Sequence, residues 1–205
     1  MTSQHRIELF LKCFFTEPGF FLEIGAWDGE TISQTAYLER VKGWKGTCVD
    51  PFPKNFLNRT CEVCDKAISK DGLTREFIKV SIDRRNGGDV SYFSGFKDVV
   101  TTHWQMIKDY CNYEIVKVET ITINNLYKQY NLPEYIEFLS VDTEGSELEI
   151  FESIDFSKSS FGLIVFEHNR DEVAREAISK ILNLNGYKFF CTIEIDDIYL
   201  NQKLL

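Results

Sequence analysis

Basic residues are scarce in this sequence. The 205 residues include 23 Lys and Arg against 32 Asp and Glu, a formal net charge of -9, and no run of Lys or Arg is longer than two. Proteins that bind nucleic acid need a basic surface that neutralises phosphate groups. The composition therefore argues against a nucleic-acid partner, and it argues equally against binding to a bilayer surface.

Long apolar runs and prolines are also few. No stretch reaches the about 20 apolar residues of a membrane span. Only four prolines interrupt a chain that is 43% hydrophobic and 14% aromatic, which excludes a disordered protein. Residues 1–18 carry Glu8, Lys12 and Glu17 and lack a small-residue cleavage site, so they predict an amphipathic lead-in helix instead of a signal peptide. We expect a single domain over residues 1–205.

The sequence also lacks a pair of C-x-x-C motifs. The six cysteines are scattered, which suits reduced thiols and predicts a cytoplasmic protein without a disulfide framework. Cys61 and Cys64 form one C-x-x-C motif, but no second copy completes a zinc site. If both lie on a strand, positions three apart point to opposite faces, and the two thiols pack separately.

Apolar segments of strand length alternate with helix-like segments, which predicts an α/β fold with a parallel sheet and crossover helices. After the last helix, two strand-like segments joined at the Asp196–Asp197 pair predict a terminal antiparallel hairpin. Five parallel strands and this hairpin make seven strands. We expect the parallel strands at 20–25, 46–50, 61–68, 136–142 and 161–167, and helices at 3–15, 31–41, 53–58, 97–111, 120–130, 145–154 and 170–185.

Residues 69–96 form a polar, glycine-containing stretch in which short strands and a mobile loop are both open. Long irregular insertions in compact domains are often binding loops. We therefore expect residues 69–111 to form an insertion that covers the substrate side of the site as a lid.

Acidic side chains gather where the predicted strands end. In an open α/β sheet, ligands bind outside the carboxyl ends of the strands, where the strand order reverses. Packing does not explain carboxylates at the tips of otherwise apolar strands. The polar and glycine residues at these ends are Glu23, Gly25, Asp28, Gly29, Asp50, Asp65, Lys66, Asp142, Glu144, Glu167, His168 and Asn169.

The loop after the first strand reads G-A-W-D-G instead of the G-x-G-x-x-G of dinucleotide-binding proteins. Gly25 and Gly29 allow a tight turn and the close approach of a ligand, although a simple strand-to-helix turn is an open alternative. Asp28 inside the loop repels phosphate but suits a ligand with an ammonium and a sulfonium. Asp50, 25 residues after Gly25, stands where a carboxylate accepts both hydroxyls of a ribose.

Four segments together carry a resemblance to a known family: "FLEIGAWDGETISQT", "GWKGTCVDPFP", "SVDTEGSELEIFESI" and "VFEHN". From about Phe20 to Asn169, the chain resembles the FkbM-type S-adenosylmethionine-dependent methyltransferases, which are Rossmann-like class I enzymes. Many of them O-methylate sugars or other hydroxyl-bearing substrates. The resemblance implies a seven-stranded sheet in the order 3-2-1-4-5-7-6 with strand 7 antiparallel.

The resemblance also implies a set of cofactor contacts. Asp50 would bind the ribose, where many relatives have Glu, and Trp27 is bulkier than the usual residue of its loop. The methionine part would meet Glu23, Gly25, Ala26, Asp28 and Gly29, with Ser33 and Thr35 nearby, and the adenine would meet Asp65, Lys66 and Ala67.

Methyl transfer to a hydroxyl needs a device that makes the oxygen nucleophilic, and two are open. In the first, Asp142, Glu167 and Asn169 bind Mg²⁺ or Mn²⁺, because hard oxygen ligands suit these cations and the cation polarises the hydroxyl. In the second, His168 or His103 is a general base without a metal. Strand alternation places His168 opposite Glu167, which weakens it as a partner.

Purely structural interpretations of the same residues are also open. Asp142 can cap the following helix, Glu144 and Glu147 can be solvated residues of a helix start, and His103 can be a surface histidine. Aromatic residues of the insertion can stack on a sugar face or belong to the core; they are Tyr92, Phe93, Phe96 and Trp104.

The leading hypothesis is an S-adenosylmethionine-dependent O-methyltransferase of a sugar or glycan hydroxyl, with a divalent metal. Alternatives are methylation of a non-carbohydrate acceptor, a nicotinamide-dependent oxidoreductase and a non-catalytic glycan-binding relative. The expected partner is a carbohydrate acceptor. Association with glycosyltransferases, or fusion to them, and the oligomeric state are left open.

Overall fold

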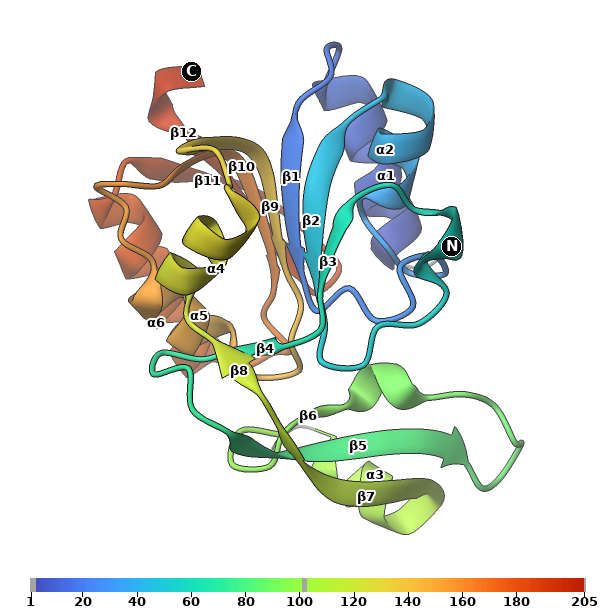
Figure 1. The fold of residues 1–205 in the computed structure, drawn as a ribbon. Coiled ribbons are helices and arrows are strands. Elements are labelled where there is room, and N and C mark those ends of the chain that lie inside the picture. The colour runs from blue at the N-terminus through green and yellow to red at the C-terminus, as the bar shows by residue number, and fades with distance from the viewer. Residues whose placement is uncertain (1–2, 101–102, 205) are drawn as a thin grey trace.

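The computed structural model describes residues 3–100 and 103–204. Its centre is a seven-stranded sheet in the order β11-β12-β10-β9-β1-β2-β3 (Figure 1). Neighbouring strands are parallel except at β12, which is antiparallel to both β10 and β11. The strands are β1 (Phe20–Ile24), β2 (Lys45–Val49), β3 (Glu62–Cys64), β9 (Tyr135–Val141), β10 (Ser160–Glu167), β11 (Tyr187–Ile193) and β12 (Asp196–Asn201).

The mostly parallel α/β sheet expected from the alternating pattern is therefore confirmed. Five further strands lie outside this sheet, so the strand numbers along the chain differ from those expected. Counted among themselves from the β3 edge, the seven strands stand in the order 3-2-1-4-5-7-6. The order reverses beside β1, and β1 and β9 are the pair that flank this switch point.

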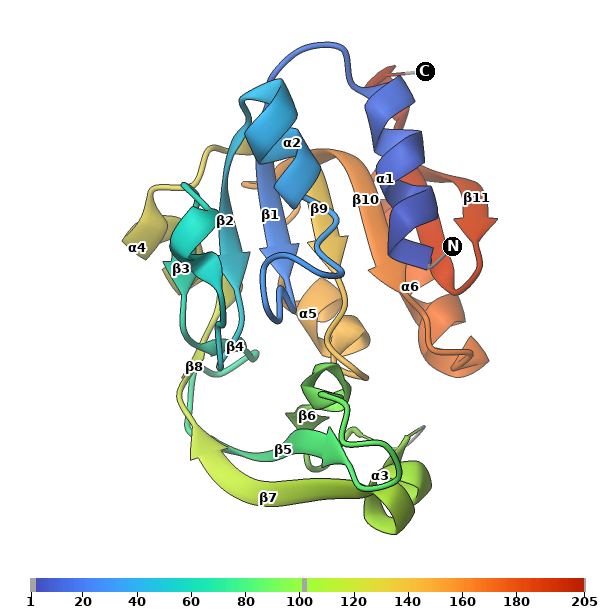
Figure 2. The same ribbon diagram turned by 90° about the vertical axis from the view of Figure 1, so that its right-hand side faces the viewer.

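Helices cover both faces of the sheet (Figure 2). One face carries α1 (Ser3–Phe14) and α2 (Ala36–Lys42), and the other carries α4 (Ile123–Tyr130), α5 (Glu147–Ser153) and α6 (Glu172–Leu184). Each face has its own buried apolar cluster, because successive side chains of a strand point to opposite faces. Phe21 belongs to the cluster under α1 and α2, and Leu22 to the cluster under α4, α5 and α6.

The two cysteines of the C-x-x-C motif follow the same rule. Cys61 packs against the cluster under α1 and α2, whereas Cys64 is buried in the cluster on the other face. The expectation that these thiols pack separately is confirmed. Among the described residues, all six cysteines are free, and no helix is long and apolar enough to cross a membrane.

The expected strand at 61–68 is wrong in extent. It divides after β3, and Ala67–Ile68 forms β4, which pairs in parallel with β8 (Thr120–Ile121) in a small separate sheet. We call the segment between this pair, residues 69–119, the insertion. The chain turns out of the main sheet at the polar pair Asp65 and Lys66 and enters the insertion through β4.

The insertion contains a three-stranded antiparallel sheet, β6-β5-β7, which we call the inserted sheet. It lies across the carboxyl ends of the main strands (Figure 2). The expected helix at 97–111 is shorter, and the following strand was not predicted. The elements are β5 (Arg75–Asp83), the 3-10 turn η2 (Ser91–Phe93), β6 (Gly95–Phe96), α3 (Trp104–Tyr110) and β7 (Cys111–Val118), while η1 (Phe56–Asn58) and η3 (Gln202–Leu204) lie elsewhere.

Candidate active site

A cavity of about 760 Å³ lies between the carboxyl ends of the main sheet and the insertion. Residues that follow β1, β2, β9 and β10 line one side, and residues of β5 and η2 line the other. This volume falls within the range of small-molecule sites. The cavity also lies at the switch point of the sheet, where open α/β sheets bind their ligands.

Only glycine fits at position 25, because the backbone at Asp142 comes close to it. Its φ is 87°, and a Cβ at this position would lie 1.6 Å from the carbonyl oxygen of Asp142. The Asp142 N–H donates to the Ile24 carbonyl at 2.9 Å, which closes β9 onto β1 just before the loop. Gly25 lines the cavity. The glycine therefore lets the ends of β1 and β9 meet under the ligand space.

Asp28 closes the turn that follows. Its Oδ1 accepts hydrogen bonds from the N–H groups of Glu30 at 2.9 Å and Thr31 at 2.8 Å, and its side chain is buried. It does not line the cavity. The helix expected from Thr31 begins only at Ala36, because residues 31–35 form a loop. Asp28 thus shapes the loop from within instead of facing a ligand.

Glu23 holds the next part of this loop. Its carboxylate accepts hydrogen bonds from Ser33 Oγ at 2.9 Å, Gln34 N at 2.8 Å and Thr35 Oγ1 at 2.6 Å. Arg59, which sequence reasoning missed, is fully buried behind the loop and donates to Thr35 Oγ1 at 2.8 Å. Glu23, Ala26, Gly29 and Ser33 lie outside the lining of the cavity, in or beside the loop that carries Gly25.

Asp50 lies in the cavity wall after β2. Its two carboxylate oxygens accept hydrogen bonds from Trp27 N at 2.8 Å and Phe52 N at 2.7 Å. Burial raises the pKa of Asp50 to about 6. Lys66 and Ala67 also line the cavity, whereas the exposed Asp65 does not.

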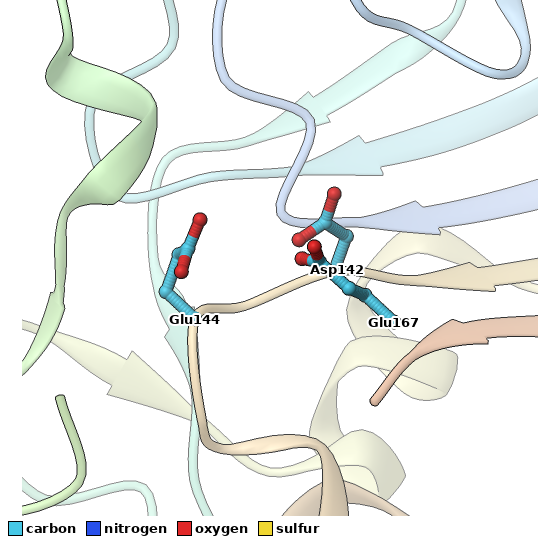
Figure 3. Close-up of side chains that lie close together, drawn as sticks. All are labelled: Asp142, Glu144 and Glu167. Atoms are coloured by element: carbon cyan, nitrogen blue, oxygen red, sulfur yellow. The ribbon is translucent and has the colours of Figure 1, made fainter. Parts of the chain in front are cut away.

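Three carboxylates converge in the part of the cavity beside the tips of β9 and β10. Asp142 follows β9, Glu167 is the last residue of the neighbouring β10, and Glu144 lies in the loop after Asp142. One oxygen from each lies within 4.8 Å of the others (Figure 3). Figure 3 shows the Asp142 and Glu167 carboxylates side by side, with Glu144 opposite them.

Electrostatic repulsion within this cluster is strong. Burial raises the pKa of Asp142 well above its ordinary value, and the charge of Glu167 adds to the shift. Burial likewise raises the pKa of Glu144 well above its usual range and that of Glu167 to about 7. Among the described residues, no Lys or Arg forms an ion pair with any of the three. Such a set of oxygen atoms suits a divalent cation.

Glu144 joins Asp142 and Glu167 in the cluster, and Asn169, the third metal ligand predicted from the sequence, lies beside it with its Nδ2 3.4 Å from Glu167 Oε2. A φ of 57° turns Glu144 toward the cavity, and Glu147 fixes that loop by accepting hydrogen bonds from Thr143 N at 2.7 Å and Gly145 N at 3.3 Å. Glu147 is buried, so its interpretation as a solvated residue is wrong. Asp142 is not the helix cap either, because α5 begins after Ser146.

A comparison with protein families decides the assignment. The model of the methyltransferase FkbM domain matches residues 23–189, which is most of the chain. The chain belongs to the FkbM methyltransferase family. No curated protein and no solved structure matched the chain.

The two histidine candidates of this FkbM methyltransferase lie in different places. His168 points away from the main cavity, where its Nδ1 accepts a hydrogen bond from Arg170 N at 3.1 Å, and it lines a smaller cavity beside α6. This agrees with the alternation that placed it opposite Glu167. The geometry therefore offers His168 no contact with a ligand in the main cavity.

His103, at the start of α3, lines the main cavity. Its ring packs on Phe93 with centroids 4.8 Å apart, and its Nε2 lies 3.8 Å from Glu144 Oε2. Burial lowers its pKa, so the ring is neutral and can accept a proton at neutral pH. Asn169 also lines the cavity and donates to Glu167 Oε2 at 3.4 Å. The FkbM methyltransferase therefore places an imidazole, an amide and three carboxylates in the lining of one cavity.

Proposed function

We propose that this FkbM methyltransferase transfers the methyl group of S-adenosylmethionine to a hydroxyl of a sugar or glycan, with the help of a divalent cation. One observation carries the proposal. A single cavity is lined by Asp50, which follows β2, and by the Asp142, Glu144 and Glu167 cluster, which lies at the tips of β9 and β10 on the other side of β1. Donor and acceptor can therefore lie in line in one space.

The Asp50 end fits the nucleoside part of the donor. Asp50 keeps lone pairs for the ribose hydroxyls although each oxygen already accepts one backbone N–H. Ala67 supplies apolar surface for the base, and the Gly25 backbone is open to the methionine part. Glu23, Asp28 and Ser33 stabilise the loop that carries Gly25 instead of touching the donor.

The acidic end fits Mg²⁺ or Mn²⁺, held by Asp142, Glu144 and Glu167. The raised pKa values of these carboxyls mark a site whose ionised form needs a positive partner. Bound there, the cation would act as a Lewis acid that lowers the pKa of a hydroxyl.

The chain itself aligns the acceptor and receives its proton. As the acceptor oxygen bonds to the methyl carbon, the carbon–sulfur bond breaks, and the hydroxyl proton passes to the neutral imidazole of His103. The rings of Tyr92 and Phe93 line the cavity near His103 and offer flat surfaces to a sugar ring. The inserted sheet lines the cavity through Phe77, Lys79 and Ser81 and so shields this part of it from solvent.

Calorimetry with S-adenosylhomocysteine tests the proposal. We expect wild-type protein to bind this product and Asp50→Asn to weaken its binding. Asp155→Asn, at a half-buried aspartate outside the cavity lining, should bind as wild type does. A panel of simple and deoxy sugars is then added with Mn²⁺ or after chelation. Sugar binding that depends on Mn²⁺ supports the full proposal.

Each part of the proposal can fail separately. Absence of S-adenosylhomocysteine binding removes the donor. Sugar binding that ignores chelation removes the cation and leaves His103 to act alone. Binding of a non-carbohydrate hydroxyl compound in preference to every sugar would favour the alternative acceptor class.

A further inference from the structure

The middle of strand β5 lines the cavity. Phe77, Lys79 and Ser81, which are two residues apart from one another, all line it, as does Val80. Side chains two residues apart point to the same side of a strand. The inserted sheet is therefore a wall of the cavity over residues 77–81.

Phe77 stands at the nucleoside end of this wall. It belongs to a buried apolar cluster with Ala67, Phe96 and Val118, and Phe52 packs against this cluster. The ring centroids of Phe52 and Phe77 are 5.7 Å apart. Since the Phe52 N–H donates to Asp50, the cluster joins the inserted sheet to the residue that faces the ribose.

The same end of the inserted sheet is fixed to the main domain by charge. Arg75, two residues before Phe77, pairs with Glu149 of α5 at 2.8 Å and with Asp98 at 2.7 Å. Lys79 lies with its Nζ 4.5 Å from the centre of the Phe52 ring. These contacts hold Phe77 in place, as a binding surface requires.

We propose that the insertion is part of the donor site, with the Phe77 ring of β5 forming the apolar wall against which the adenine of the donor lies. The inference rests on the proposed function and adds a residue that the resemblance does not provide. A flat, apolar base is recognised by an aromatic ring that covers its face. Ala67 and Phe52 complete the pocket around the base.

The test compares Phe77→Leu with Val118→Ala. Val118 lies in the same buried cluster but not in the cavity lining, so its variant loosens the cluster without removing a ligand contact. Thermal unfolding of both variants checks that they remain folded. Dissociation constants for S-adenosylhomocysteine and for adenosine are measured by calorimetry.

We expect Phe77→Leu to weaken the binding of both ligands by a similar factor of about tenfold, because a base–aromatic contact has about this value. Val118→Ala should bind both ligands as wild type does. Equal losses in the two variants would show that Phe77 acts only through packing, and an unchanged Phe77→Leu would overturn the inference directly. If wild-type protein binds neither ligand, the proposed function fails, and this inference fails with it.

Discussion

The indole nitrogen of Trp27 donates a hydrogen bond to the hydroxyl of Ser91 at 2.8 Å. Trp27 lies in the loop after β1, and Ser91 begins η2 in the insertion, so the bond joins two segments that both line the cavity. The Trp27 N–H also donates to Asp50, and Lys54 Nζ donates to the same Ser91 hydroxyl at 2.7 Å. Trp27, the bulky residue of its loop, therefore links the loop after β1 to the insertion.

Removal of this link should loosen η2. Ser91→Ala deletes both side-chain bonds and Trp27→Phe deletes one, so we expect hydrogen exchange at Ser91–Phe93 to accelerate in both variants and more in the first. A net value of about 1 kcal/mol per hydrogen bond corresponds to about fivefold. Exchange is read by mass spectrometry. Ser157→Ala, at an exposed serine far from the cavity, is the control, and unchanged protection in Ser91→Ala would contradict the link.

Asp50 makes donor binding depend on pH. Its pKa of about 6 lies above the ordinary value because of burial, and only the ionised form accepts hydrogen bonds from both ribose hydroxyls. Affinity is therefore complete above pH 6 and is lost as the pH falls through this value, by about tenfold for each pH unit below it. Calorimetry with S-adenosylhomocysteine between pH 5 and 8, in steps of roughly one unit, measures this. Asp50→Asn should bind weakly at every pH, and a wild-type affinity that is equal at both ends of the range would refute the assignment.

The ligand set predicted from the sequence contains Asn169, whereas the cluster in the structure contains Glu144. Metal binding to two variants tells these sets apart. We expect Glu144→Gln to weaken Mn²⁺ binding by at least about tenfold, because it removes one of three charged ligands. Asn169→Ala should have a smaller effect, since its amide is uncharged and donates a hydrogen bond to Glu167 at 3.4 Å. Electron paramagnetic resonance of Mn²⁺ gives both constants, with Asp155→Asn as control. A larger loss in Asn169→Ala would restore the set predicted from sequence.

Gly25 and Gly186 form a matched pair for backbone strain. Their φ angles are 87° and 86°, but an added Cβ at Gly186 meets nothing within 4 Å. Gly186→Ala should cost about 1 to 2 kcal/mol of unfolding free energy from the left-handed conformation alone. Gly25→Ala should cost more than about 4 kcal/mol, because its Cβ collides with the Asp142 carbonyl. Urea denaturation compares them, and equal losses would mean that β9 can move away from β1.

The sequence predicted the elements whose apolar runs are buried on both faces. Strands β1, β2, β9 and β10 lie within one residue of their expected starts, and the tips that carry Asp50, Asp142 and Glu167 meet at one cavity as expected. These features follow from periodicity and from the common direction of parallel strands.

The rest depended on contacts that the sequence does not display. Strand β7 was missed because most of its residues are exposed, so it has no apolar alternation. Glu144 was expected at the tip of its strand but not in the metal set, because its direction is set by a loop that Glu147 holds through hydrogen bonds. Arg59 belongs to no recognisable sequence motif. Its contact with Thr35, in the loop after β1, becomes visible only in the structure.

The insertion leaves and re-enters the main domain at adjacent points, because β4 pairs with β8. Ser69 and Thr120 reinforce this neck with hydroxyls 2.6 Å apart. Lengthening a segment whose two ends are already paired destabilises the fold little, since each doubling of a loop's length adds only about 0.6 kcal/mol to the free energy of closing it. Residues added to the far part of this segment would therefore leave the β4–β8 pairing, and with it the folding of the main sheet, undisturbed.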